Sequence, residues 1–420
     1  MSYYAIDFGT SNSLLNYISS SGEVTQVPLE HDGGFVLRSL LFTPQKGKWY
    51  FGEEAINAYM DYDGEGRFFR SLKKFLPEPN YTGSEVHNQK LKIEDLISIF
   101  LKEMRLRADK YLNLKVDKLV LGRPAKYSLR DDNDQLAQDR MRKASELAGF
   151  NEIHFCPEPL AAGLDYSNKS GEDKNVLIAD FGGGTSDFTL MKFHAGEYSQ
   201  DDILGLSGIF QAGDALDGEF MLKFIAKHFG ADFSYQLTFG NNILKFPKNL
   251  LQKICSPAHI THLRERDTWE FLQAIQKFSL DADNKKKLDQ LFTLVECQLG
   301  FPIFDKIEQT KIQISKGDEK LNEFKFTYPG IHIEEQIERN LYFEQMSSVI
   351  DQIFASLMEV FEQSGTTPSD VHEICITGGT AQFPLIQKRL EEIFGSQKIV
   401  QHDIYQSVVG GLAQFAKKLL

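Results

Sequence analysis

Hydrophobic and polar positions follow two different periods along this chain. Short apolar runs broken by glycine, serine and asparagine predict β-strands, and apolar positions that recur every three or four residues predict helices. In the first part of the chain the predicted strands are Tyr3–Asp7, Ser13–Ile18, Glu23–Val27, Val116–Leu121 and Ile153–Cys156. The predicted helices there are Ile93–Leu112, Asp134–Ala148 and 157–164. Because strands and helices alternate, this part of the sequence predicts an α/β fold.

The polar stretch 168–174 predicts a domain boundary, and strands and helices alternate again after it. The predicted strands of the second part are Asn175–Asp180, Phe324–Tyr328 and Glu373–Thr377, and its predicted helices are 214–228, 334–363, Pro384–Phe394 and Tyr405–Leu419. In residues 245–316 the apolar positions recur largely with helical spacing, which predicts mainly helices. We therefore expect a second α/β part that contains a helical subdomain.

One internal repeat links the two parts. Residues 5–13 read AIDFGTSNS, and residues 179–187 read ADFGGGTSD. Each copy contains the end of an apolar strand, an aspartate, a turn rich in glycine and hydroxyl groups, and the start of a second strand. The repeat predicts a duplicated domain with one such hairpin in each lobe.

The two turns have the chemistry of a phosphate site. Glycine turns with serine and threonine present backbone N–H groups and hydroxyls to an anion, and glycine lets a phosphate approach closely. The aspartate before each turn offers hard oxygen ligands to Mg²⁺, which keeps several of its waters. Two such turns facing each other would hold a polyphosphate chain between two lobes. The sequence lacks the GxxxxGK[ST] loop of P-loop nucleotidases.

Composition narrows the possible partners and location. The 420 residues are 42% hydrophobic and 25% charged, as in a globular protein of two or three domains. A net charge of −13 repels phosphate backbones, so we expect no nucleic-acid partner. Four widely spaced cysteines without a CxxC pair indicate a reducing compartment. Because the N-terminus has no signal-peptide pattern and no apolar run is long enough to span a membrane, we expect a cytoplasmic protein without a membrane partner.

Five motifs, in order, resemble those of the actin-like ATPase superfamily and, within it, the 70-kDa heat-shock chaperones. They are two phosphate loops at 7–13 and 180–187, two connecting segments at 157–163 and 407–413, and an adenosine motif at 377–384. The resemblance implies a two-lobed fold of the actin and hexokinase type, with ribonuclease H-like lobes and a nucleotide cleft between them.

The same resemblance implies the domain limits. The first lobe would contain residues 1–168 and 400–420, and the second residues 169–399, with the helical subdomain at about 214–316. The motifs match only the ATPase part of the family, as in the short bacterial YegD-type proteins. Because the chain ends directly after this part, we expect no peptide-binding domain in it.

Roles for individual residues follow from the resemblance. Asp7 and Asp180 would orient hydrated Mg²⁺. The catalytic residues would be Lys73, Glu158, Asp187 and Thr185, with Lys74 as an alternative to Lys73. The residues that hold the phosphates would be Gly9, Thr10, Ser11, Gly182, Gly183 and Gly184 together with Thr185. The residues that hold the nucleoside would be Gly213, Glu308, Lys311, Ser315, Gly378, Gly379, Thr380 and Gln382.

Two positions depart from the family pattern. Ile312 and Gln382 stand where the family has the two arginines that sandwich adenine, so the preference for adenine over guanine is open. Each missing arginine removes a cation–π contact of roughly 0.5–2 kcal/mol.

The resemblance favours an ATP/ADP-binding, chaperone-like protein that hydrolyses ATP slowly with Mg²⁺. Its protein partners would be a client, a co-chaperone or an exchange factor in trans. Three alternatives stay open: a non-hydrolysing, nucleotide-dependent switch that binds a partner through 231–305, a small-molecule kinase with Asp187 as its base, and a filament-forming actin relative.

Overall fold

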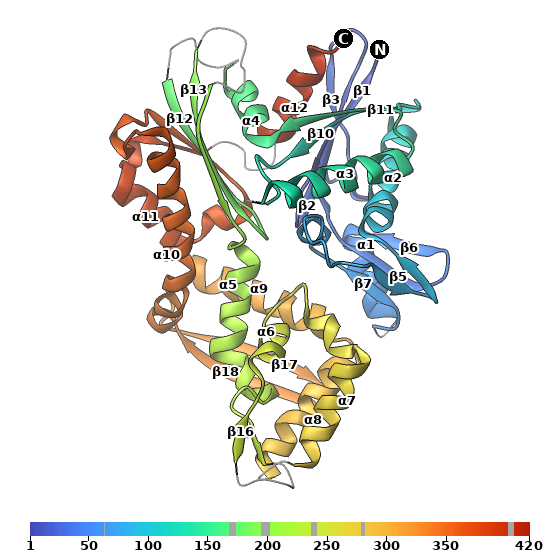
Figure 1. Cartoon of the computed structure of the whole chain (residues 1–420), viewed down its shortest axis with the longest axis vertical. Helices are drawn as coiled ribbons and strands as arrows, with labels where there is room; N and C mark the ends of the chain where they lie inside the picture. The colour runs from blue at the N-terminus through green and yellow to red at the C-terminus, as the bar shows by residue number, and fades with distance from the viewer. Residues whose placement is uncertain are drawn as a thin grey trace.

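The computed structural model of the chain describes residues 1–62, 64–128, 130–167, 174–194, 202–236, 242–278, 282–401 and 407–420. The described residues form two lobes, each built around one mixed β-sheet, with a mainly helical extension below the second lobe (Figure 1). The strands of the first sheet, in spatial order, are β11 (Glu152–Pro157), β10 (Lys118–Arg123), β1 (Tyr3–Phe8), β2 (Asn12–Ile18) and β3 (Val24–Gln26), and β4 (Leu37–Arg38) pairs with β2. The strands of the second are β14 (Ile203–Ile209), β13 (Ser186–Phe193), β12 (Lys174–Phe181), β19 (Glu373–Thr377) and β20 (Ile399–Gln401).

The two sheets share one topology. In the first, β1 runs antiparallel to β2 and parallel to β10, and β10 runs parallel to β11. In the second, β12 runs antiparallel to β13 and parallel to β19, and β19 runs parallel to β20. The sequence repeat occupies the equivalent hairpins β1–β2 and β12–β13. The expected duplicated, two-lobed α/β fold is therefore confirmed.

Each sheet is covered on both faces by helices. Helices α2 (Ile93–Leu112) and α3 (Asp131–Leu147) share an apolar core with the first sheet, and α10 (Arg339–Ser364) and α11 (Pro384–Phe394) share one with the second. On the opposite faces, α4 (Glu158–Ser167) packs on the second sheet through Ala162, and α12 (Ser407–Lys417) packs on the first through Leu412.

Helices α4 and α12 therefore cross between the lobes. Each follows the last strand of one sheet and packs against the sheet of the other lobe. The two helices are so close that a Cβ atom on Gly411 would lie 1.6 Å from the carbonyl oxygen of Ala161. Only glycine at position 411 allows this crossing, which joins the lobes at their bases.

Smaller elements extend both lobes toward the mouth of the cleft. The first lobe adds β5 (Leu41–Gln45), β6 (Lys48–Phe51), α1 (Gly52–Asp61), β7 (Arg67–Phe69), the 3₁₀ turn Leu72–Phe75, β8 (Ser84–Val86) and β9 (Gln89–Leu91). The second adds α5 (Gly213–Phe220), a π-helical turn at Met221–Ile225, a 3₁₀ turn at Ala226–Phe229, β15 (Ser234–Gln236), β16 (Ile243–Lys245), α6 (Lys248–Ile254), α7 (Arg266–Lys277), α8 (Ala282–Glu296), α9 (Gly300–Lys316), β17 (Leu321–Tyr328) and β18 (Ile331–Glu338).

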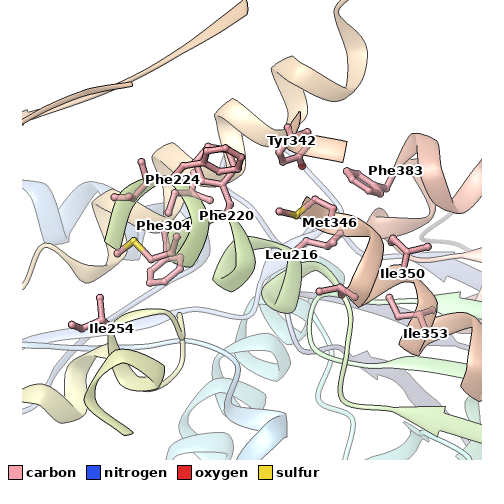
Figure 2. Packing of buried hydrophobic residues seen from close by; sticks show 14 of the residues in the cluster. Leu216, Phe220, Phe224, Ile254, Phe304, Tyr342, Met346, Ile350, Ile353 and Phe383 are labelled. Carbon is pink, nitrogen blue, oxygen red and sulfur yellow. The ribbon is translucent and has the colours of Figure 1, made fainter. Parts of the chain in front are cut away.

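Helix α5 is held in place by a large apolar cluster of the second lobe. Leu216 and Phe220 from α5 point toward Tyr342 and Met346 of α10, and Phe304 of α9 lies on their other side (Figure 2). All five side chains are almost fully buried. Because α5 begins at Gly213, this packing fixes the position of a segment that reaches the cleft.

One predicted helix boundary was wrong. The helix expected at 334–363 begins only at Arg339, and residues Ile331–Glu338 form strand β18 instead. Ile331, Ile333 and Ile337 are buried and Glu335 is partly buried, whereas the alternate residues are exposed, which is the two-residue period of a strand. The predicted boundary at 168–174 and the predicted start of the last helix at Tyr405 fall largely outside the described residues. The domain limits 1–168 with 400–420, 169–399 and 214–316 stay predictions.

Candidate nucleotide site

A deep cleft of about 960 Å³ lies between the lobes. Both lobes contribute to its lining, from the two repeated hairpins to α5, α9 and the segment after β19. All the site residues expected from the sequence line this cleft except Gly184. The expected residues found there are Asp7, Gly9, Thr10, Ser11, Lys73, Glu158, Asp180, Gly182, Gly183, Thr185, Asp187, Gly213, Glu308, Lys311, Ser315, Gly378, Gly379, Thr380 and Gln382.

The two glycine turns face each other across the cleft. Each turn is closed by one backbone hydrogen bond, from the Gly9 amide to the Asn12 carbonyl (3.0 Å) and from the Gly182 amide to the Thr185 carbonyl (2.9 Å). A Cβ atom on Gly183 would lie 2.0 Å from the hydroxyl oxygen of Ser11 in the other turn. The turns are therefore in contact, and a side chain at position 183 would have to displace the side chain of Ser11.

The second turn is tied to the segments on the nucleoside side. The Thr380 hydroxyl donates to the Gly182 carbonyl (2.7 Å), and the Asp214 amide donates to the Gly183 carbonyl (2.6 Å). Gly378 has a φ of +83°, and a Cβ there would lie 2.1 Å from the Phe181 carbonyl oxygen. This region of backbone conformation favours glycine, so the first glycine of the adenosine motif has a local structural cause.

Four carboxylates and one lysine gather at one end of the cleft. The Lys73 ammonium lies 2.8 Å from a carboxylate oxygen of Glu158, and both side chains are about seven-eighths buried. Burial and the nearby Glu158 raise the pKa of Asp7 to about 7, and the same two causes raise that of Asp180 to about 6. Burial and the neighbouring Asp180 raise the pKa of Asp187 to about 7. Burial alone would lower the pKa of Lys73, but Glu158 holds it above its usual value.

This acidic end has the properties of a cation site. Clustered buried carboxylates repel one another, and a divalent ion would relieve that repulsion. Among the described residues, no group of three or more His, Cys, Asp and Glu side chains is arranged to hold a metal on its own. Asp7 and Asp180 therefore fit an ion that keeps water and phosphate oxygens in its shell, as Mg²⁺ does.

Two of the expected nucleoside residues, Lys311 and Glu308, are engaged in ion pairs. The Lys311 ammonium lies 2.6 Å from Asp217, and Glu308 lies 3.7 Å from Arg38 of the other lobe. Burial raises the pKa of Asp217 to about 6, although Lys311 opposes the shift. Ile312 lines the same side of the cleft and is 44% exposed.

The structure adds one group of residues that the sequence did not indicate. Asp214, at the start of α5, is 6% exposed and lies 2.7 Å from Lys74 and 3.3 Å from Arg70 of the first lobe. Ser71 donates to the same carboxylate (3.2 Å) from a left-handed backbone conformation with φ 55°. We call Arg70, Ser71, Lys74 and Asp214 the cross-cleft cluster.

The cross-cleft cluster explains why residue 184 is a glycine. A Cβ there would lie 2.3 Å from Cε of Lys74, so the stem of this lysine crosses to the second lobe directly over the glycine. Lys73 faces Glu158 in the cleft, whereas its neighbour Lys74 faces Asp214. The only sequence signal for the cluster was the Lys73–Lys74 pair itself.

Comparison with known proteins agrees with these motifs. The family model described as "Hsp70 protein" matches residues 76–245 and 283–416. The chain is 24% identical to "Chaperone protein DnaK" of Thermotoga petrophila over 396 residues, which is 93% of this chain and 55% of that protein. It is 23% identical to "Chaperone protein DnaK" of Nitrosopumilus maritimus over 416 residues, which is 97% of this chain and 55% of that protein.

The chain thus spans about half the length of the curated relatives it matches. Within the described part of the chain, no helix has both the length and the hydropathy of a membrane span. The matched residues lie in both lobes and include the second glycine-rich hairpin and most of the residues that line the cleft, but not the first hairpin. The chain belongs to the Hsp70 family and contains its ATPase part.

Proposed function

We propose that the cleft binds Mg-ATP and Mg-ADP and that the protein hydrolyses ATP slowly. The observation that supports this most strongly is the contact between the two glycine turns beside the buried acidic end. The turns offer backbone N–H groups to the phosphates from both lobes, and the acidic end offers Asp7 and Asp180 to a hydrated cation. Bound Mg²⁺ would neutralise charge on the phosphate oxygens.

The neighbouring side chains suit the transfer of the terminal phosphoryl group to water. Glu158 and Asp187 would orient the attacking water, whose oxygen forms a bond to the γ-phosphorus while the bond to the bridging oxygen breaks. ADP leaves with the electron pair of that bond, and the proton of the water passes to Asp187. A pKa of about 7 suits Asp187 for accepting and returning this proton. Lys73 and the Thr185 hydroxyl would stabilise the charge of the transferred group.

The nucleoside would lie along α9 and the segment after β19. Lys311 and Glu308, one helical turn apart, would bond the ribose hydroxyls, with Gly213, Ser315 and Gly378–Thr380 around them. Ile312 and Gln382 give the base an apolar and an amide contact in place of two arginines. We therefore expect weak discrimination between adenine and guanine.

The biological role proposed here is a nucleotide-dependent chaperone cycle in the cytoplasm. A client, a co-chaperone or an exchange factor would act in trans, and nucleic acids and membranes would not take part. A second candidate is a switch that binds nucleotide without hydrolysing it and meets its partner through 231–305. The absence of both arginines at the base positions favours this second candidate.

The test measures phosphate release from Mg-ATP by the wild type and by Asp180→Ala. Asp351→Ala is the control, because that surface aspartate on α10 lies outside the cleft. We expect slow release that Asp180→Ala abolishes and Asp351→Ala preserves. Nucleotide binding without release would support the switch instead, and equal release by all three proteins would contradict the site.

A further inference from the structure

A second, smaller cavity lies beside the acidic end of the cleft. Its volume is about 70 Å³. Thr10, Lys73, Thr185 and Asp187 line both this cavity and the cleft. The rest of its wall comes from Lys74 and from two segments of different lobes, 124–128 after β10 and 206–210 at the end of β14. We call this cavity the side pocket.

The side pocket extends from the interior to the surface. Lys73 and Tyr127 at its inner end are 13% and 5% exposed. Lys126 is exposed, and Phe210 at the outer end is 53% exposed. A small ligand at the acidic end therefore has a second direction in which to move, besides the mouth of the cleft.

The polar groups of the side pocket suit an anion. Among the described residues, the buried hydroxyl of Tyr127 has no hydrogen-bond partner, so it is free to donate to a ligand. Lys73 and Lys74 add positive charge, which Glu158 and Asp214 offset at 2.8 and 2.7 Å, and the carboxyl group of Asp187 also lines the pocket. An anion would meet donors here without the large excess of positive charge that would hold it tightly.

The outer wall is apolar and is shaped by a glycine. Leu206, Ile209 and Phe210 form it on the second lobe, and Pro124 on the first. Gly208 faces Asp187, and a Cβ at position 208 would lie 2.7 Å from the carboxylate oxygen Oδ1 of that aspartate. A larger residue would displace the Asp187 carboxylate, so the glycine preserves the shape of the junction between pocket and cleft.

We propose that the side pocket is the exit for inorganic phosphate, and that phosphate leaves through it while ADP still occupies the cleft. This inference rests on the proposed nucleotide site. ADP would fill the space between the glycine turns and α9, and the side pocket opens from the opposite, acidic end. The Tyr127 hydroxyl would donate to the phosphate on its way out.

The experiment uses a matched pair of substitutions on one strand. Leu206→Trp fills the side pocket, because Leu206 lies on the same face of β14 as Gly208, whereas Ile203→Trp adds a similar volume at the start of β14, away from the pocket. Both side chains are half-buried, so their effects on folding should be similar. Single-turnover phosphate release is followed with a fluorescent phosphate sensor, and ADP release with a fluorescent ADP analogue. We expect Leu206→Trp to slow phosphate release about tenfold without changing ADP release, and Ile203→Trp to change neither.

A second measurement separates this inference from the proposed hydrolysis. Inorganic phosphate is titrated into protein saturated with Mg-ADP, and we expect it to bind without displacing ADP. Tyr127→Phe should weaken this binding about 2- to 10-fold, the effect of one hydrogen bond, and Leu206→Trp should slow it. This titration applies even if ATP is never hydrolysed or Leu206→Trp fails to fold.

Three results would overturn the inference. They are phosphate release by folded Leu206→Trp at the wild-type rate, phosphate binding only after ADP has left, and unchanged phosphate affinity in Tyr127→Phe. Absence of nucleotide binding would instead refute the proposed function, and the two failures are therefore distinguishable.

Discussion

The cross-cleft cluster predicts that Asp214 controls how long the lobes stay closed. Replacing Asp214 with asparagine keeps its shape and removes its charge. The carboxylate is 6% exposed, whereas Lys74 and Arg70, 22% and 19% exposed, keep some contact with water. Removing one partner of a buried ion pair costs about 3–5 kcal/mol, and the partial exposure of both cations reduces this to about 2–3 kcal/mol.

This free energy favours the closed arrangement, because the cluster joins the first lobe to α5 of the second. If all of it affects closure, ADP release from Asp214→Asn should be about 30- to 150-fold faster than from the wild type. Stopped-flow displacement of a fluorescent ADP analogue measures this rate. Arg38→Met is the control, because the Arg38–Glu308 pair is 3.7 Å apart with both side chains at least one-third exposed, and such a pair contributes about 0–1 kcal/mol.

A double-mutant cycle tests whether the faster ADP release comes from loss of the Lys74–Asp214 ion pair. Lys74→Met and Asp214→Asn should each accelerate ADP release, and the double variant should be no faster than Asp214→Asn. Additive effects would show that Lys74 and Asp214 act separately. An ADP release rate in Asp214→Asn that equals that of Arg38→Met would refute the reasoning about burial.

Three further predictions concern the metal site, the helix crossing and the base. Asp7 has a pKa of about 7 in the metal-free fold and an ordinary, lower value when unfolded, so its contribution to stability falls as the pH rises from about 4 to 7. Asp7→Asn should therefore stabilise the metal-free protein by about 1–4 kcal/mol at pH 8 and by less at pH 5, as measured by urea unfolding. An equal gain in stability at pH 8 and pH 5 would contradict the raised pKa of Asp7. Gly411→Leu should lower the free energy of unfolding by about 3 kcal/mol or more, because the leucine side chain would overlap the backbone of Ala161 in α4. A melting temperature of Gly411→Leu equal to that of the wild type would refute this. Ile312→Arg and Gln382→Arg should each tighten Mg-ATP binding about 2- to 30-fold through cation–π contacts, and calorimetry that finds no change would place the base elsewhere.

The sequence predicted the repeated hairpins well because their signals are local. An apolar strand, an aspartate and a glycine turn specify each hairpin within about ten residues, and the structure places both at the cleft. The central helices and strands of both lobes were also predicted, since each has a clear period.

The sequence did not predict contacts between distant segments. The pairing of Lys74 with Asp214 depends on how the two lobes face each other, which no local pattern specifies. Strands such as Arg67–Phe69 and Ser84–Val86 have three residues each, too few to show a period. Residues 334–338 of strand β18 were assigned to a helix because the strand runs directly into α10, and because Glu335 interrupts the apolar alternation of its inner face.

The central claim is that the cleft binds a nucleotide through its phosphates and a divalent ion. Calorimetric titration with ATP, first with Mg²⁺ and then with a chelator, tests this most directly. We predict binding of one ATP per chain with Mg²⁺ and much weaker binding without it, and Gly183→Val should abolish binding because its side chain would displace Ser11 and occupy space between the two turns. Absence of ATP binding with Mg²⁺, or equal binding by Gly183→Val, would contradict the account.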